Sequence, residues 1–223
     1  PATGMEYLAA KVYRPRMLRN LRNDSLYRQG RETLQDSGRV VKKRERRVML
    51  AIEKRTNFGQ LVSHMSWLGY EFVTLRRLYE AGAAVPKPLA VSPNTVLMAY
   101  VGDAGRAAPT LHEISLSPHE AVVIFREVMR NVELMLSQGL VHADLSAFNI
   151  LYWQGAIHLI DFPQVIDIHI NRSARSILAR DLLRVCQYFQ GQGVDCDPEA
   201  IMHRLWDRYG VQADLLLLED ESD

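Results

Sequence analysis

The sequence predicts an α+β protein in which a small part rich in β-strands precedes a larger helical part. Strand-like segments and one helix lie before residue 102, whereas amphipathic helical patterns dominate after residue 109. The segment 102–109 consists mostly of glycine, alanine and proline, which is typical of a boundary between lobes. We therefore expect an N-terminal lobe over 1–101, a C-terminal lobe over 102–210 and an acidic tail over 211–223.

The N-terminal lobe contains three segments with clear patterns. Residues 7–13 are partly β-branched and aromatic and predict a strand. Residues 67–81 carry an apolar stripe at helical spacing and end before a glycine, which predicts a helix. Residues 89–91 and 95–101 predict a hairpin of two buried strands, because the Ser, Pro and Asn between them favour a turn.

The C-terminal lobe begins with a helix signal at Ser117 and Glu120, whose spacing is that of a capping box. Apolar residues then recur at helical spacing up to a glycine. Residues 140–168 indicate loops and short strands. Two further amphipathic helices are expected over 171–190 and 197–209.

The charges are distributed unevenly, although the formal net charge of the 223 residues is only +1. Basic residues far outnumber acidic ones in the segment 14–55. Periodicity is weak from 14 to about 66, so we expect a basic, partly mobile insertion there, with a helical stretch around 44–54. The segment 14–55 is a candidate for binding the phosphates of RNA, although most basic runs are simply solvated.

The composition predicts a cytoplasmic protein without membrane contact. No apolar run approaches the roughly 20 residues of a membrane span, and the first residues do not form an export signal. Cys186 and Cys196 lack the dense, even spacing of a secreted disulfide framework, which favours a reducing compartment.

The candidate chemistry lies between residues 141 and 163, where three polar side chains accompany apolar runs. Asp144 and Asn149 are five positions apart across a tight loop, and Asp161 follows an apolar strand that can return it to the same place. Phosphoryl transfer from a nucleotide needs a carboxylate near the accepting hydroxyl and oxygen ligands for magnesium. One acid after a strand is usually a turn residue, but His142-x-Asp144 followed by Asn149 and a second acid is a kinase-like arrangement.

Lys11 and Glu71 complete the set of candidate residues. An ammonium group in the middle of the strand 7–13 would be costly to bury unless an anion met it. Glu71 lies on the predicted helix 67–81 and can supply that carboxylate, as the phosphate-gripping lysine of kinases requires. Taken separately, each residue is more often a surface charge.

Four stretches resemble the RIO family of atypical serine/threonine protein kinases, nearer its first subgroup than its second, and the short chain looks archaeal or bacterial. They are Ala10-Lys-Val-Tyr13, the segment from Glu71 to Pro88, Val141-His-Ala-Asp-Leu-Ser-Ala-Phe-Asn-Ile-Leu-Tyr152, and Leu159-Ile-Asp-Phe-Pro-Gln164. The resemblance spans nearly the whole chain, and its third stretch is highly distinctive. It implies a two-lobed protein-kinase-like fold with a small β-rich N-lobe and a helical C-lobe.

The resemblance also implies roles for the site residues. Lys11 and Glu71 become the ion pair that orients the nucleotide phosphates, and Asp144 becomes the catalytic aspartate. Asn149 and Asp161 become the metal ligands, with Lys11 and Asp161 taking part in catalysis.

Nucleotide recognition is implied at the segment between the lobes. Met98 takes the gatekeeper position, and Ala99 and Val101 offer a backbone carbonyl and a backbone amide to adenine. The implied cofactors are ATP and Mg²⁺, with Mn²⁺ as an alternative. The implied function is a protein kinase or ATPase in maturation of the small ribosomal subunit, whose precursor or RNA would contact the basic segment 14–55.

The chain departs from the family pattern at three places. Pro163 stands where members usually carry a small polar residue, and Ala147 replaces an acidic residue, but neither change removes a metal ligand. Only ten residues precede Lys11, which is too few for the phosphate-covering loop. We therefore expect an N-lobe that is truncated or incompletely present.

Two other functions are compatible with the residues. A small-molecule phosphotransferase of the aminoglycoside or choline kinase type shares the His-x-Asp pattern with Asn five residues on, although Ala143 and the segment 146–148 favour the RIO family. A non-catalytic assembly factor would instead use the segment 14–55 to grip RNA. Nucleotide binding that depends on magnesium distinguishes the enzymes from the assembly factor.

Overall fold

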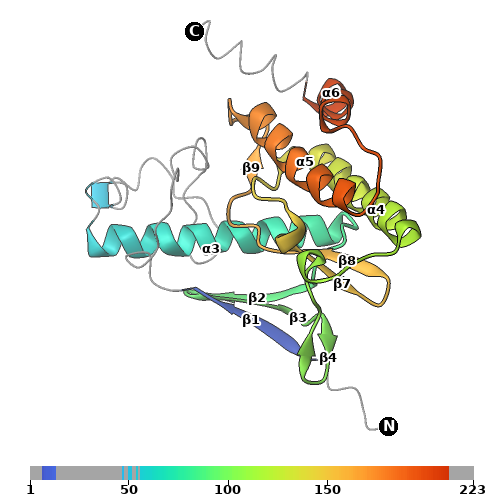
Figure 1. The fold of residues 1–223 in the computed structure, drawn as a ribbon. Helices are drawn as coiled ribbons and strands as arrows, with labels where there is room; N and C mark the ends of the chain where they lie inside the picture. Colours follow the sequence, from blue (N-terminus) through green and yellow to red (C-terminus); the bar gives the residue numbers. More distant parts are fainter. Residues whose placement is uncertain (1–6, 14–46, 48–49, 52–53, 55, 211–223) are drawn as a thin grey trace, which may run out of the picture.

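The computed structural model describes residues 7–13, 47, 50, 51, 54 and 56–210. The acidic tail predicted over 211–223 and most of the basic segment 14–55 lie outside these residues. Of the helical stretch expected around 44–54, Arg47, Leu50 and Ala51 are helical. A group of strands and a group of helices meet along the long helix α3 (Asn57–Glu80), which confirms the predicted α+β class (Figure 1).

The first group is a three-stranded antiparallel sheet with the order β1-β3-β2. Strand β1 (Leu8–Val12) pairs with β3 (Thr95–Ala99), which pairs with β2 (Pro88–Ser92) across a tight turn. Helix α3 packs on β2 and β3 and covers one face of the sheet (Figure 1). The predicted hairpin is therefore present, but β2 is largely exposed instead of buried, because it is an edge strand.

Helix α3 is longer than the helix predicted over 67–81. It begins after Thr56, whose hydroxyl accepts a hydrogen bond from the Gly59 amide at 3.1 Å and so satisfies a free N–H group of the first turn. Residues 57–66 of the expected insertion are therefore helical. The sequence pattern misses them because small and polar residues interrupt the apolar spacing in these first turns.

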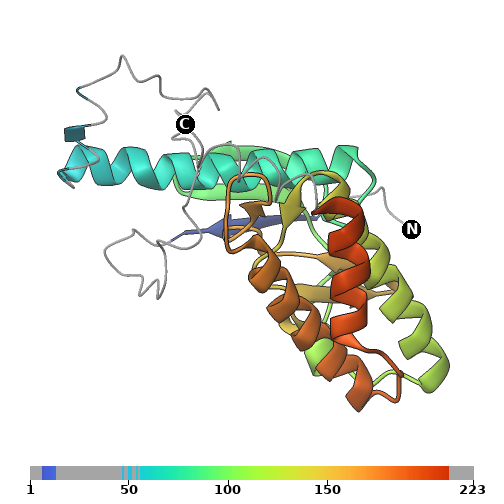
Figure 2. The ribbon, with the colours of Figure 1, turned by 90° about the horizontal axis from the view of Figure 1, so that it is seen from above.

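The second group is helical. Helix α4 (Pro118–Ser137) starts at the predicted capping box, in which the Ser117 hydroxyl accepts from the Glu120 amide at 3.3 Å and Glu120 accepts from the Ser117 amide at 3.0 Å. Helix α5 (Ala174–Gly191) and helix α6 (Pro198–Tyr209) follow as predicted, with short shifts at their ends. Figure 2 shows the three helices gathered beside the C-terminal end of α3.

The connector 102–109 forms a small hairpin in which β4 (Gly102–Asp103) pairs with β5 (Arg106–Ala107). Gly102 has a φ of +140°, and a Cβ atom there would lie 2.5 Å from the Arg106 carbonyl oxygen, so only glycine fits. The pattern of the sequence does not predict this hairpin, because strands of two residues are too short to show alternation. A 3₁₀ turn, η2 (Leu111–Glu113), leads from the hairpin toward α4.

Short strands fold the stretch 140–168 into two ribbons, in agreement with the expected loops and short strands. The ribbons pair β6 (Leu140–Val141) with β9 (Ile166–Asp167), and β7 (Ile150–Trp153) with β8 (Ala156–Leu159). The 3₁₀ turn η3 (Ala147–Asn149) precedes β7. The Ile160 amide donates to the Asn149 carbonyl at 3.0 Å, which holds the loop before β7 against the loop after β8.

Two hydrophobic clusters stabilise the described residues. The larger cluster joins α4, α5, α6, the short strands and the last turns of α3, where Leu75 and Leu78 are buried. The smaller cluster lies between the sheet and α3 and contains Tyr13, Leu68 and Val96. Met98 packs against both clusters, so the end of β3 connects the sheet to the helical lobe.

Within the residues that the structure describes, no helix combines the length and the hydrophobicity needed to cross a membrane.

Candidate active site

Three charged side chains from distant parts of the chain meet beside the sheet. Lys11 Nζ lies 2.7 Å from Glu71 Oε1 and also forms an ion pair with Asp161 Oδ1. Only 3% of the Glu71 side chain is exposed, compared with 40% of the Asp161 side chain. The cluster is therefore anchored in the protein interior at Glu71 and opens toward solvent at Asp161.

The register of the sheet explains why Lys11 points inward. Along β1 the residues are alternately exposed and half-buried, and Lys11 is among the half-buried ones. Opposite it on β3 lies Val96, which is fully buried. Because α3 covers this face of the sheet, Glu71 on α3 is within reach of the ammonium group.

Tyr13 is a further member of this cluster that the sequence analysis does not single out. Its hydroxyl donates to Glu71 Oε2, and Lys11 Nζ lies 5.0 Å from the centroid of its ring. Both oxygens of the buried Glu71 carboxylate are therefore hydrogen-bonded, one by an ammonium group and one by a phenol. A tyrosine two positions after a strand lysine shares its face of the sheet, and this spacing is the signal that identifies it.

Asp144 and Asn149 are held together across the tight loop between them. Asn149 Nδ2 donates to the Asp144 carbonyl oxygen at 2.7 Å and lies 3.5 Å from Asp144 Oδ2. Arg184 on α5 contacts the other carboxylate oxygen, with 2.9 Å between Nη1 and Asp144 Oδ1. The Asp144 side chain remains 38% exposed, so an incoming group can reach it.

Ala143 and Asp161 both adopt the left-handed backbone conformation, with φ values of 67° and 69°. This conformation costs a non-glycine residue about 1 kcal/mol and persists where the surroundings fix it. Arg180 on α5 donates from Nη2 to the Ala143 carbonyl oxygen, and His142 Nε2 bonds the Ile160 carbonyl oxygen at 3.0 Å. The backbone next to each of the two candidate acids is thus held by a side chain.

His142 is buried directly before this strained loop. Burial lowers the pKa of its imidazole, while the hydrogen bond to Ile160 and the carboxylates of Asp161 and Asp144 act in the opposite direction. The ring is therefore neutral near pH 7. A carbonyl oxygen can only accept, so Nε2 carries the proton and Nδ1 is an acceptor.

Asp181 is a buried acid of α5 that lies against the back of the same loop. Burial raises its pKa to about 6, although Arg180 and the backbone of Leu145 and Ala143 lower it. Arg180 Nη2 lies 3.4 Å from Asp181 Oδ1. Asp181 interrupts the apolar stripe of α5, and a lone acid within such a stripe is the sequence signal that could have identified it.

A cavity of about 470 Å³ opens between the sheet and the loops, a size typical of small-molecule sites. It is lined by every residue that the sequence analysis assigned to nucleotide or metal, namely Lys11, Glu71, Met98, Ala99, Val101, Asn149 and Asp161. Asp144 does not line it. The structure therefore brings these residues to one cavity and leaves Asp144 outside its wall.

The apolar end of the cavity is formed by the segment after β3. The Ala99 amide donates to the Lys87 carbonyl at 2.8 Å, and the Val101 carbonyl accepts from the Ala108 amide at 2.9 Å. Among the described residues, no hydrogen-bond acceptor meets the Val101 amide. This amide is therefore available to a ligand at the cavity wall.

Asn149 and Asp161 fit a hard divalent cation by the chemistry of their oxygens. The amide nitrogen of Asn149 is engaged by Asp144, so its oxygen is the atom left to coordinate. Across the described ranges, no three His, Cys, Asp or Glu side chains gather into a complete metal cage. Mg²⁺ is commonly bound by one or two protein groups together with substrate phosphates, so the donor set suits Mg²⁺ or Mn²⁺.

Comparison with known proteins places these residues in a family context. Residues 7–201 match the RIO domain family. The RIO-type serine/threonine-protein kinase Rio1 of Haloferax volcanii is 36% identical over 144 residues, which are 64% of this chain and 48% of that protein. The protein of the same name from Thermoplasma acidophilum is 30% identical over 135 residues, or 60% of this chain and 69% of that protein.

A eukaryotic protein is also similar. The serine/threonine-protein kinase rio1 of Schizosaccharomyces pombe is 33% identical over 132 residues, which are 58% of this chain and 26% of that protein. The match thus spans about half the length of the Haloferax relative and about a quarter of the Schizosaccharomyces relative.

Replacing Tyr13 by phenylalanine should lower the free energy of unfolding by about 1–3 kcal/mol, because Oε2 of the buried Glu71 loses its donor. In thermal unfolding followed by circular dichroism, the Tm should fall by about 2–10 °C. Tyr7→Phe is the matched control, because Tyr7 is an exposed tyrosine just before β1. Equal Tm values for the two variants would contradict the role assigned to Tyr13.

The buried Asp181 should make stability decrease as the pH rises. Because its pKa is raised from 3.8 to about 6 on folding, the folded chain holds this proton more tightly than the unfolded chain between those values. The stabilisation is fully present below about pH 4 and is lost as the pH passes about 6, an effect of about 3 kcal/mol.

Urea denaturation at several pH values tests this dependence. Asp181→Asn should flatten the decrease in unfolding free energy over this pH window, whereas Asp207→Asn, at an exposed position on α6, should retain it. The same slope in the wild type and in Asp181→Asn would show that Asp181 is not the titrating group.

Proposed function

Because the chain belongs to the RIO domain family, we propose that it is a RIO-type serine/threonine kinase or ATPase that transfers phosphoryl groups from ATP with Mg²⁺. The observation that carries this proposal is the contact of Lys11 with both Glu71 and Asp161 at the polar end of the cavity. Kinases use a lysine paired with a helix glutamate to hold nucleotide phosphates beside a metal-binding aspartate.

The cavity suggests one orientation for ATP. Adenine needs an acceptor and a donor along one edge, and Ala99 and Val101 offer backbone groups at the apolar end. The phosphates would then extend toward Lys11. Lys11 can keep its bond to Glu71 and donate its other protons to phosphate oxygens.

The metal would be held by Asn149 and Asp161, and when bound it neutralises charge that develops on the transferred phosphoryl group. Asp161 would have to exchange its contact with Lys11 for the cation. Asp161 lines the cavity and its side chain is 40% exposed, so its carboxylate is accessible to the cation.

Asp144 is suited to the acceptor side of the reaction. It lies outside the nucleotide cavity, is partly exposed and is held by Asn149. In the proposed step the bond between the γ-phosphorus and the bridging oxygen breaks, and a bond forms to the attacking hydroxyl or water oxygen. The proton of the attacking group passes to Asp144.

Asp161 and Asp144 should therefore fail differently when replaced. Asp161→Ala should lose the magnesium dependence of ATP affinity, because the cation loses its carboxylate ligand. Asp144→Ala should bind ATP normally and lose turnover by about a hundredfold or more, as expected for a positioned base. Calorimetric titration with and without Mg²⁺, together with steady-state turnover, measures both effects.

Asp103→Ala is the control, because Asp103 is an exposed aspartate of β4 outside the cavity. It should match the wild type in affinity and turnover. Equal loss of ATP binding in the Asp161 and Asp144 variants would contradict the division of roles.

The acceptor distinguishes a kinase from an ATPase. Label transferred from γ-labelled ATP to serine or threonine resists hydroxylamine, whereas an aspartyl-phosphate on Asp161, which the family resemblance suggests, is acid-stable and discharged by hydroxylamine. Turnover with release of free phosphate and no protein label would favour transfer to water.

We also propose that the basic segment 14–55 binds RNA of the small ribosomal subunit or its precursor. Its excess of lysine and arginine supports the proposal, since each neutralised phosphate releases counterions and makes affinity fall with salt.

An RNA titration at two salt concentrations tests this second proposal. Alanine at the basic cluster should weaken binding and reduce the salt slope; the cluster is Lys42, Lys43, Arg44, Arg46 and Arg47. Alanine at Arg175 and Arg204, which are exposed on α5 and α6, is the control and should change neither quantity. An unchanged slope in the cluster variant would mean that the segment is only a solvated surface.

A further inference from the structure

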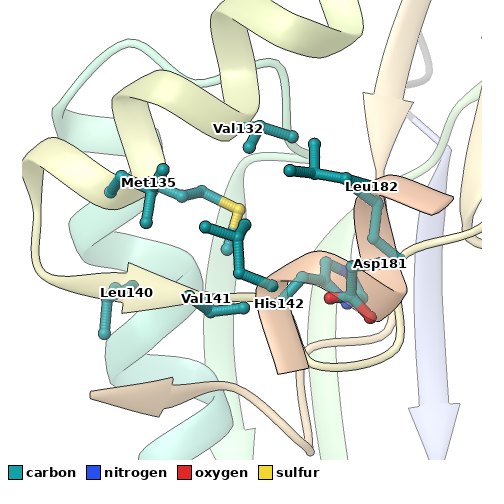
Figure 3. Close-up of a pocket in the computed structure, with 10 residues that line it drawn as sticks. Val132, Met135, Leu140, Val141, His142, Asp181 and Leu182 are labelled. Atoms are coloured by element: carbon teal, nitrogen blue, oxygen red, sulfur yellow. The ribbon is translucent and has the colours of Figure 1, made fainter. Parts of the chain in front are cut away.

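A second, much smaller cavity lies behind the loop that carries Asp144. Its volume is about 10 Å³, and it is lined by residues of α4, β6, the loop itself and α5. Figure 3 shows the side chains around it. Its lining is aliphatic or methionine except at two positions, His142 and Asp181.

Both polar side chains present an unpartnered atom in this region. His142 Nδ1 and Asp181 Oδ2 are buried and have no hydrogen-bond partner among the residues that the structure describes, and each residue is only 2% exposed. Their other polar atoms are engaged: Nε2 bonds the Ile160 carbonyl, Oδ1 faces Arg180, and the Asp181 carboxylate also accepts from the backbone of Leu145 and Ala143. A buried polar atom left without a partner costs about 1–3 kcal/mol, and each such atom in a native structure calls for an explanation such as a bound water.

The two atoms have the same hydrogen-bonding character. Since Nε2 must donate to the Ile160 carbonyl, Nδ1 of the neutral ring can only accept. An ionised carboxylate oxygen also only accepts, so the two groups cannot satisfy each other. A group with two donors and the size of one small molecule would satisfy both.

We infer that the small cavity holds one ordered water molecule, which donates one hydrogen bond to His142 Nδ1 and the other to Asp181 Oδ2. The cavity volume is at the lower limit for one water, and buried waters typically join polar groups that otherwise lack partners. The cavity has no room for the further oxygen ligands that Ca²⁺ or Mg²⁺ would need beside these two atoms, so a metal cation does not fit it.

This water connects α5 to the loop at the residue two positions before Asp144. Arg180 already bonds Ala143 from the same helix, so the water adds a second attachment on the other side of the strained peptide. The consequence for turnover rests on the proposed function: Asp144 would be positioned through His142 and its water. His142 and Asp181 are positioning residues in this scheme and do not touch the nucleotide.

The test combines a high-resolution crystal structure of the chain at about pH 8, where Asp181 is ionised, with water-to-protein cross-relaxation in NMR. We expect density for one water between the two atoms and a cross-relaxation signal at the His142 ring. Nitrogen NMR should show Nδ1 unprotonated. An empty cavity, or a proton on Nδ1 that lets His142 donate directly to Asp181, would overturn the inference.

Val132→Ile adds a methyl group from α4 to the cavity and should displace the water, and Val141→Ile does the same from β6. Val123→Ile is the matched control, because Val123 is exposed on the same helix as Val132. Displacement should remove the cross-relaxation signal and lower the Tm by about 4 °C or more, since two acceptors lose their donor. If the cavity is instead dry, the added methyl group fills a void and the Tm should rise in both cavity variants. That result would overturn the water site.

Turnover then tests the positioning role. In Val132→Ile, turnover should fall about tenfold or more while ATP affinity stays that of the control, because the residues of the nucleotide cavity are untouched. Unchanged turnover after loss of the water would overturn the positioning role. Failure of the wild type to bind ATP would refute the proposed function alone, because the density and the Tm results decide the water site independently.

Discussion

Lys11 Nζ contacts two carboxylates that come from elements far apart in the sequence, Glu71 on α3 and Asp161 after β8. A charge that is half-buried beside a buried carboxylate is tolerated only while its partners remain in place. Among the described residues, strand β1 has a single neighbour in its sheet, and a slip of one residue against β3 would turn Lys11 to the face opposite α3. The contacts of Lys11 therefore depend on three features at once. These are the register of β1, the orientation of α3 that turns Glu71 toward the sheet, and the left-handed backbone of Asp161.

The helical lobe could be predicted closely because its signals are local. A capping box at Ser117 and apolar stripes at helical spacing define the three helices without reference to distant residues. The candidate acids and Asn149 also follow from local spacing. Local spacing does not predict that these residues meet at one cavity, because their meeting depends on how the ribbons of β6–β9 and β7–β8 fold back.

The sequence does not reveal the features that depend on tertiary contacts between residues far apart in the chain. Nothing in the spacing around Arg184 indicates that it reaches Asp144, since the two are forty positions apart. Asp181 is visible only as an interruption of an apolar stripe, and its role depends on the loop packed behind it. The first turns of α3 are helical although their own periodicity is weak, because a good N-cap starts them and a strongly packed helix continues them.

Helix α3 is a single helix of 24 residues, about 36 Å long, that carries side chains of both hydrophobic clusters. Leu68 belongs to the small cluster, Glu71 follows it by one turn, and Leu75 one turn later is embedded in the large cluster. The helix is therefore a rigid element that is anchored at its C-terminal end in the core of the helical lobe. A packing change at Leu75 would move Glu71, which lies one turn away on the same rigid helix. Such a change in the core would therefore reach the Lys11 ammonium group through α3 and not through the segment between the lobes.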